Sequence, residues 1–323
     1  MRRPSTYILV TAFLLFPLVM TNAYYMHLTY LILIYAIAAS GLNVVTGYAG
    51  QLSLGHAAFF ALGAYSSALL TLELHWSFPA AVLASAAVAS MFGGLLGLPS
   101  LRLRGPYLAL VTAGFGEIIR ITINNWEDLT QGSRGIQSIP PPSLFGSTLS
   151  SPLARYYLLA FVLLISIGAI YRLRYSHLGR AWIAIRDNEP AAGSAGINTL
   201  AYKVLAFAVS AFFSGMAGSL YAHYLGYISP DTFTFAESVL FLSMVVVGGK
   251  GTVWGPIIGA AALTLVPDFL SFLEGFKMVF HGLLLVAAMM FLPGGLASLA
   301  GTLKWWPRFR PQRGGDSIGA SGG

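Results

Sequence analysis

The amino-acid sequence predicts an all-α polytopic membrane protein with about ten transmembrane helices (8–10) and both termini in the cytoplasm. The composition is the first observation: 56% of the 323 residues are hydrophobic and only 9% are charged, whereas a soluble domain carries about a quarter charged residues. Long apolar runs separated by turn residues are the second, and the placement of lysine and arginine is the third.

Ten apolar runs are candidates for helices that cross ~30 Å of hydrocarbon. Turn signals such as Arg104-Gly105-Pro106 and Ser229-Pro230-Asp231 separate them. One run, 235–248, is too short to cross straight, so we expect a half-helix or a re-entrant segment there. In chain order the runs cover residues 6–22, 28–46, 53–72, 78–99, 106–124, 155–171, 202–225, 235–248, 252–271 and 277–293.

The first run also resembles a secretory signal peptide, since Arg2 and Arg3 precede the apolar stretch 7–20. However, Thr21-Asn22-Ala23 is a poor small-x-small cleavage site, and many further spans follow it. We therefore expect an uncleaved first helix.

The basic residues give the orientation. With the N-terminus inside, 14 of the 18 lysines and arginines fall on inner segments, while most acids fall on outer ones. An excess of basic residues inside orients membrane proteins, so this split supports ten spans. It also accounts for the net charge of +7 without nucleic acid, which would need a basic surface with exposed aromatic residues.

Residues 41–65, GLNVVTGYAGQLSLGHAAFFALGAY, read as a broken helix followed by polar side chains. A bare backbone turn inside a membrane is tolerated only where protein covers it or where it lines a wet cavity. A tight turn between packed helices and a segment of a translocation path are therefore both open, and the charge pattern places the break at the cytoplasmic end. The path candidates here and at a second predicted break near 235–255 are Asn43, Gly47, Tyr48, Gly50, Gln51, Ser53, His56, Gly248 and Gly249.

Two loops are long. The outer loop, 125–154, is polar and stiffened by Pro140-Pro141-Pro142, so it is either a docking surface or a solvated connector. The inner loop, 172–200, contains a predicted short helix that begins with the capping segment Asp187-Asn188-Glu189-Pro190 and ends at Gly196. Such a smooth helix fits a groove on another protein, although an interfacial linker is the alternative.

The tail, 301–323, is basic and then rich in glycine and serine, and we expect it to be disordered in the cytoplasm.

The sequence shows no arrangement of residues for covalent or metal chemistry. The chain has no cysteine, and its six histidines show no metal-ligand spacing with a carboxylate partner. Residues 248–252, GGKGT, fail the phosphate-loop pattern, whereas Gly251, Gly255 and Gly259 give a helix face that allows close packing. Glu117 is the one acid that we place within the membrane, and it is either a functional residue or part of a structural ion pair with its helix-face neighbour Arg120.

Four blocks of sequence resemble the permeases of branched-chain amino-acid ABC importers, and most closely their M-type subunit. The first is the signature 41–59, GLNVVTGYAGQLSLGHAAF, and the second joins EIIRITINNW at 117–126 to QGSRGI at 131–136. The third is RDNEPAAGSAGI at 186–197, followed by SGMAG at 214–218, and the fourth is GGKGTVWGPIIGA at 248–260. The blocks span roughly residues 25–295 in the expected order, so the resemblance is specific.

The resemblance implies a permease domain over residues 1–300 in the bacterial cytoplasmic (inner) membrane, surrounded by lipid. It would pair with an H-type permease subunit, rest on two cytoplasmic ABC ATPase subunits and receive substrate from a periplasmic binding protein. ATP and magnesium would bind the ATPase partners, with no cofactor on this chain. The residues that would couple to the ATPase are Asp187, Asn188, Glu189, Pro190, Ala191, Ala192, Gly193 and Gly196, of which Gly193 departs from the longer, often acidic, residue common in relatives.

The leading function hypothesis is therefore an alternating-access import permease for branched-chain or hydrophobic amino acids. A same-family importer of urea, short amides or other organic or amino acids is the alternative, because substrate selection lies largely with the binding protein. An ion-coupled secondary transporter acting alone is a second class, which usually shows several embedded acids. A membrane enzyme is disfavoured, because no nucleophile, metal or cofactor constellation is seen.

Overall fold

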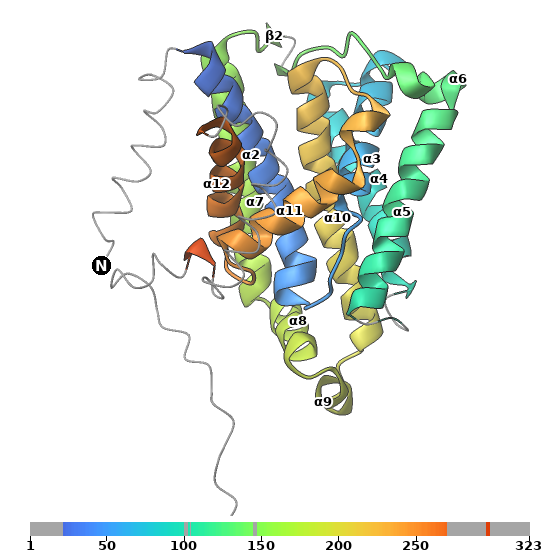
Figure 1. The fold of residues 1–323 in the computed structure, drawn as a ribbon, viewed down its shortest axis with the longest axis vertical. Helices are drawn as coiled ribbons and strands as arrows, with labels where there is room; N and C mark the ends of the chain where they lie inside the picture. The colour runs from blue at the N-terminus through green and yellow to red at the C-terminus, as the bar shows by residue number, and fades with distance from the viewer. Residues whose placement is uncertain (1–21, 100–102, 104, 145–146, 270–294, 298–323) are drawn as a thin grey trace, which may run out of the picture.

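The computed structural model describes residues 22–99, 103, 105–144, 147–269 and 295–297, which form a bundle of helices (Figure 1). The predicted helices 6–22 and 277–293 and the tail 301–323 lie outside these residues. The described helices are α2 (Ala23–Asn43), which continues as a π-helix at Val44–Tyr48, α3 (His56–Leu72), α4 (Phe78–Gly97), α5 (Pro106–Asn125), α6 (Glu127–Thr130), α7 (Pro152–Tyr175), α8 (His177–Asp187), α9 (Glu189–Ser194), α10 (Thr199–Leu225), α11 (Phe235–Gly248) and α12 (Gly255–Phe269).

Six described segments are long and apolar enough to cross a membrane: 23–48, 78–97, 106–125, 152–175, 199–225 and 230–248. The helices at 56–72 and 255–265 are apolar but shorter. The prediction of an all-α polytopic membrane protein is confirmed, and the helices lie within a few residues of the runs expected for this part of the chain.

Helix α10 is the central element, because it packs against α2, α3 and α4 and is buried over most of its length. Its small residues allow this close approach. A Cβ on Gly218 would clash with the Phe60 backbone of α3, and one on Gly63 would clash with the Gly215 backbone of α10. Helices α3 and α10 therefore meet by backbone-to-backbone contact at these glycines.

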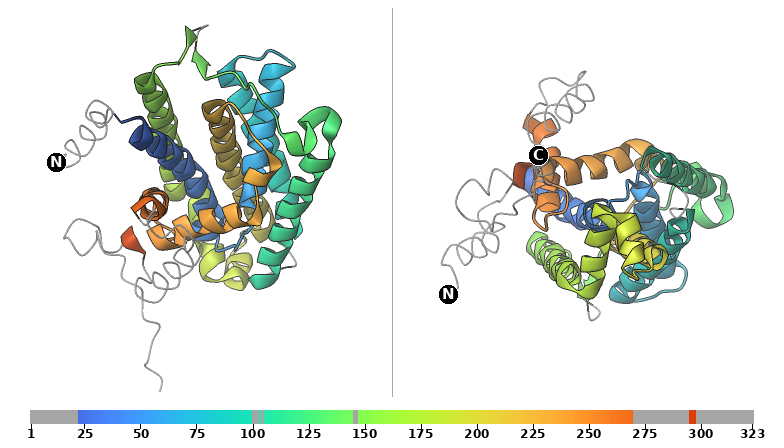
Figure 2. Two further views of the ribbon diagram at one scale, coloured as in Figure 1. Left: turned by 45° about the horizontal axis from the view of Figure 1, so that its top comes forward. Right: turned by 90° about the horizontal axis from the view of Figure 1, so that it is seen from below.

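Helix α11 has 14 residues and runs across the bundle rather than along it (Figure 1; Figure 2, left). This matches the expected half-helix. Its last residues turn sharply into α12, and a Cβ on Gly248 would clash with the backbone of Gly255, while one on Gly259 would lie 3.1 Å from the Gly248 Cα atom. The predicted close packing is confirmed for Gly255 and Gly259, whereas Gly251 lies in the turn before α12, with φ +77°, and is not part of that helix face.

The two long loops lie at opposite ends of the bundle (Figure 1). At one end, α8 and α9 close the inner loop, and the view from that end shows them beneath the middle of the molecule (Figure 2, right). At the other end, α6 and a small antiparallel pair, β1 (Ser143–Leu144) and β2 (Ser147–Thr148), build the outer loop. This loop is tied to the bundle by an Ile136–Ile228 bridge and by the His223 Nδ1–Pro140 O hydrogen bond of 2.8 Å. Its docking role stays a prediction.

Candidate functional site

The break after α2 is built from a π-helix and a glycine turn. Residues 44–48 take the wider π-helical form, a feature frequent at functional sites, and helical geometry ends at Ala49. Gly50 then has φ +69°, a conformation that favours glycine, and residues 50–55 lead without regular structure to α3. The predicted interruption near 47–56 is therefore present, and most of its residues are buried, although Gly50 and Leu52 are exposed.

Asn43 joins this break to the turn between α11 and α12. Its side-chain amide donates to the Thr252 carbonyl at 2.7 Å, and its carbonyl oxygen accepts from the Gly251 N–H at 2.8 Å. The turn is made possible by Gly249 and Gly251, which have φ values of +120° and +77°. One buried amide thus satisfies two backbone groups and holds the two helix breaks together.

Arg186 adds the end of α8 to the same cluster. Its guanidinium donates from Nη1 to the Gly47 carbonyl at 2.9 Å and pairs with the neighbouring Asp187, with Nη2 2.9 Å from Oδ1. A Cβ on Gly50 would lie 3.1 Å from the Arg186 Cβ, so the backbone at Gly50 lies directly against the Arg186 side chain. We call Asn43, Gly47, Arg186, Gly251 and Thr252 the junction.

Helix α9 follows α8 after a single residue. The Asn188 side chain caps it by accepting from the Ala191 N–H at 3.1 Å, and Pro190 lies in the first turn. Gly196, with φ +84°, closes its end. The local features expected of this helix are therefore confirmed, and the Gly193 position has open space around it, so a longer side chain would be accommodated.

A buried ion pair fixes α9 to α10. The Lys203 ammonium, on a residue that is 1% exposed, lies 2.5 Å from the Glu189 carboxylate. Breaking such a pair leaves an uncompensated buried charge, so the two helices are held to move together. The Trp182 ring is also fully buried and donates to the Tyr202 carbonyl at 2.7 Å, which means that it packs inside the fold instead of anchoring at the membrane surface.

His56 lies in a second polar cluster, separate from the junction. Ser210 donates to the Gly41 carbonyl at 2.7 Å, so the His56 Nε2–H donates to Ser210 Oγ at 2.6 Å, and Nδ1 accepts from Ser53 at 3.0 Å. All of these side chains are buried. The chain links the start of α3 to α10 and α2, and the burial favours the packed-turn interpretation for Ser53 and His56, whose place in a path stays a prediction.

The remaining path candidates divide between these clusters. Tyr48 is buried, with the Arg174 guanidinium 5.5 Å from its ring centre. Gln51 is buried and donates weakly from its side chain to the Ala49 carbonyl at 3.4 Å. Gly248 and Gly249 form the α11–α12 turn next to Gly251. The sequence had not indicated Arg186, Thr252 or Lys203 as members of a site.

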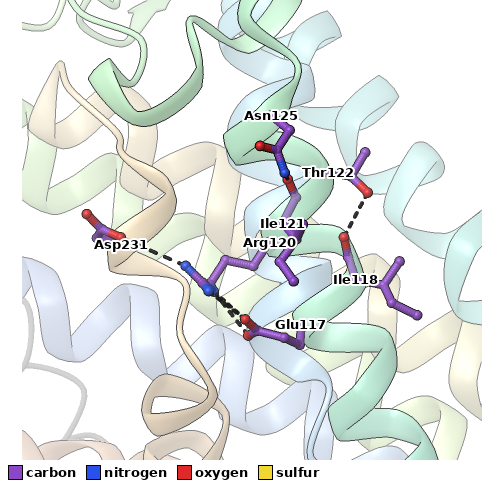
Figure 3. A network of polar contacts seen from close by, with 7 residues as sticks. All are labelled: Glu117, Ile118, Arg120, Ile121, Thr122, Asn125 and Asp231. Carbon is purple, nitrogen blue, oxygen red and sulfur yellow. Dashed lines mark hydrogen bonds and ion pairs between the residues drawn. The ribbon is translucent and has the colours of Figure 1, made fainter.

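The predicted ion pair on α5 is present. Arg120 donates to both oxygens of Glu117, with Nε 3.1 and 3.0 Å from them, and its Nη1 lies 3.9 Å from the Asp231 carboxylate (Figure 3). The Glu117 and Arg120 side chains are 44% and 27% exposed. An acid and a base so exposed on a spanning helix are not expected to face lipid tails.

The count of one embedded acid is wrong. Glu237 lies in the first turn of α11, inside the apolar segment 230–248, and is half-buried. Because it lies next to the polar turn 229–231, the sequence did not indicate that this residue is embedded. Among the described residues no group of three His, Cys, Asp or Glu side chains is placed to hold a metal ion. That ATP and magnesium bind a partner chain stays a prediction.

Comparison with known proteins agrees with this architecture. The family described as "Branched-chain amino acid transport system / permease component" matches residues 24–303. The high-affinity branched-chain amino acid transport system permease protein LivM of Salmonella typhimurium (strain LT2) is 40% identical over 287 residues, which cover 82% of this chain and 68% of that protein. LivM of Escherichia coli (strain K12) is 40% identical over 289 residues with the same coverage.

A second type of permease is also similar. LivH of Escherichia coli (strain K12), named as a permease protein of the same kind of system, is 26% identical over 289 residues, or 81% of this chain and 90% of that protein. No solved structure matches the chain. The matches cover the helix breaks and the α8–α9 segment, and the chain belongs to the family of permease components of branched-chain amino acid transport systems.

Proposed function

We propose that this chain is the membrane-spanning subunit of an ATP-driven importer of branched-chain or other hydrophobic amino acids. The observation that carries the proposal is α9: a short helix at one end of the bundle, exposed along Pro190, Ala191 and Gly193, and linked by Glu189 and Arg186 to spanning helices. Force applied to α9 would reach α10 through Lys203 and both helix breaks through the junction. The relatives' names support the substrate class.

The partners follow from this arrangement. The exposed face of α9 would sit in a groove on one of two cytoplasmic ATPase subunits, and a periplasmic binding protein would deliver substrate at the opposite end. We place the exposed Glu117–Arg120 face of α5 toward an H-type permease subunit, since a protein surface covers such a pair better than lipid does. ATP binding would then close the ATPase dimer and tilt α9, α10 and the breaks between outward-open and inward-open states.

The finer topology belongs to the same proposal. We infer that the chain crosses the membrane ten times and that both termini lie in the cytoplasm. Residues 1–300 form the permease domain, with the loop 172–200 inside and the loop 125–154 outside, and residues 301–323 form a cytoplasmic tail. The basic residues of the described inner loop support it, since Arg172, Arg174 and Arg180 lie at the α9 end of the bundle.

The experiment that tests the proposal places a large side chain on α9. Ala191→Trp covers the exposed face of α9 without touching the helix caps, whereas Ser150→Trp adds the same bulk to an exposed position at the other end. We expect Ala191→Trp to abolish copurification of the ATPase subunits and Ser150→Trp to retain it. Equal recovery of the ATPase with both variants would refute the assignment of α9.

An ion-coupled transporter acting alone is less well supported. In the part of the chain that the structure describes, Glu237 joins Glu117 as an embedded acid, yet Glu117 is neutralised by Arg120. Carboxylates in a proton relay lie within reach of one another, and no ion pair or hydrogen bond of the described residues joins these two.

A further inference from the structure

Glu237 is an embedded carboxylate that the proposed coupling does not use. Within the described residues, the ion pairs of the structure do not include it. Figure 1 shows that α11 crosses the bundle, so its first turn lies about half-way along α5. An ionisable residue at such a depth is a candidate for contact with a transported solute.

The neighbours of Glu237 are aromatic. The Tyr35 hydroxyl from α2 is a hydrogen-bonding neighbour of its carboxylate, and the Tyr221 hydroxyl of α10 lies nearby. Phe241 follows one turn later on the same face of α11, with its ring centre 5.6 Å from that of Tyr35 and 5.3 Å from that of Phe60. Rings from α2, α3, α10 and α11 thus converge at the start of the half-helix.

The cluster is largely buried. Phe60, Phe241 and Tyr221 are 1%, 0% and 8% exposed, whereas Tyr35 and Glu237 are partly exposed. The Phe233 ring extends the apolar wall, 5.9 Å from Phe60. A half-buried carboxylate backed by aromatic rings is an arrangement that can receive a cation with an apolar body, because the rings also attract the cation.

A purely structural role is the competing explanation. A carboxylate in the first turn of a helix is favoured by the partial positive charge of the helix N-terminus. That role needs no aromatic neighbours and no tyrosine hydroxyl from a different helix.

We propose that Glu237 binds the α-ammonium group of an amino acid in transit, with Tyr35 orienting the carboxylate and Phe60, Phe233 and Phe241 accommodating the apolar side chain. The inference rests on the proposed import function and adds a specificity-determining subsite to it. Glu117 does not compete for this role, because Arg120 already occupies its carboxylate (Figure 3). Urea and short amides carry no ammonium group and would not use this subsite.

The test uses the complete transporter, with its permease, ATPase and binding-protein partners, in proteoliposomes. Glu237→Gln should lower the leucine moved per ATP hydrolysed by at least about tenfold, because the ammonium loses its counter-charge. Glu237→Asp should retain most transport. Glu73→Gln removes an exposed acid at the end of α3 and should leave the ratio unchanged.

A second measurement does not depend on transport. Dicyclohexylcarbodiimide modifies carboxyl groups in apolar surroundings, and mass spectrometry reports modification of Glu237. We expect leucine to protect Glu237 and isocaproate, which is leucine without its ammonium group, to leave it reactive. Two outcomes would overturn this inference alone, provided that the wild-type complex takes up leucine. In the first, Glu237→Gln leaves the leucine moved per ATP hydrolysed unaltered. In the second, leucine and isocaproate protect Glu237 from modification equally. Absence of wild-type amino-acid uptake would instead refute the proposed function.

Discussion

At the scale of single residues, the structure assigns the strongest constraints to side chains that satisfy backbone groups of distant segments. Asn43 and Thr252 are 209 positions apart, and Arg186 and Gly47 are 139 apart. A buried backbone group left without a partner costs about 1–3 kcal/mol, so each of these contacts determines how the helix breaks are placed.

Asn43→Leu tests the junction. The substitution keeps the volume roughly constant and leaves the Gly251 N–H and the Thr252 carbonyl unpaired, so we expect a loss of about 2–4 kcal/mol in the free energy of unfolding. Asn125→Leu is the matched control, since that exposed amide donates only to the Ile121 carbonyl of its own helix. Thermal unfolding in detergent compares the two, and equal losses would show that the junction adds no stability.

The Glu189–Lys203 pair predicts an asymmetric mutant cycle. Glu189→Gln leaves the buried Lys203 ammonium uncompensated and should cost about 3 kcal/mol, whereas Lys203→Met leaves a carboxylate that is 20% exposed and should cost less. The double variant should recover most of the loss, because a neutral pair replaces the buried charges. Additive losses would contradict a direct pairing. Asp187→Asn, at an exposed pair, should change stability by under about 1 kcal/mol.

At the scale of elements, the bundle is organised by helices that approach at glycine. The Gly218 Cα of α10 lies so near α3 that a Cβ there would be 2.8 Å from the Phe60 carbonyl carbon. Since α10 also carries Lys203 and Ser210, its close contacts fix the ion pair to α9 relative to the polar cluster at the start of α3.

Gly218→Ala should therefore destabilise the protein by about 1–3 kcal/mol through overpacking. Gly168→Ala, in the exposed interior of α7 with nothing within 4 Å of the added Cβ, should be neutral or stabilising by about 0.5–1 kcal/mol. Unfolding temperatures of the two variants provide the comparison. A stabilising Gly218→Ala would contradict the close α3–α10 approach.

Local features of the elements could be read from the sequence, and long-range contacts could not. Apolar runs predicted the long described helices but not α6 or α8, and Asn188, Pro190 and Gly196 predicted the short helix α9, because these signals lie within a few residues of one another. The meeting of Asn43 with Gly251 depends on tertiary packing that periodicity does not contain. Lys203 was read only as an inner basic residue, since its burial depends on Glu189 from a different helix.

At the scale of the whole molecule, α9 and the outer loop lie at opposite ends of the bundle (Figure 1). This placement supports a protein that couples events on the two faces of a membrane.

The chain has no cysteine, so single cysteines report topology without any background. In intact cells, Ser138→Cys should react with a membrane-impermeant maleimide, whereas Ser194→Cys should react only after permeabilisation. Ser5→Cys and Ser317→Cys, near the two termini, should behave like Ser194→Cys. Labelling of Ser194→Cys in intact cells would invert the proposed orientation.

The most direct test of ATP-driven import is uptake of radiolabelled leucine into proteoliposomes, because α9 can transmit force only if a partner ATPase supplies it. The complete complex with binding protein and ATP should accumulate leucine, and omission of the ATPase subunits or of ATP should reduce uptake to the level of empty vesicles. Leucine accumulation by this chain without an ATPase would contradict the account.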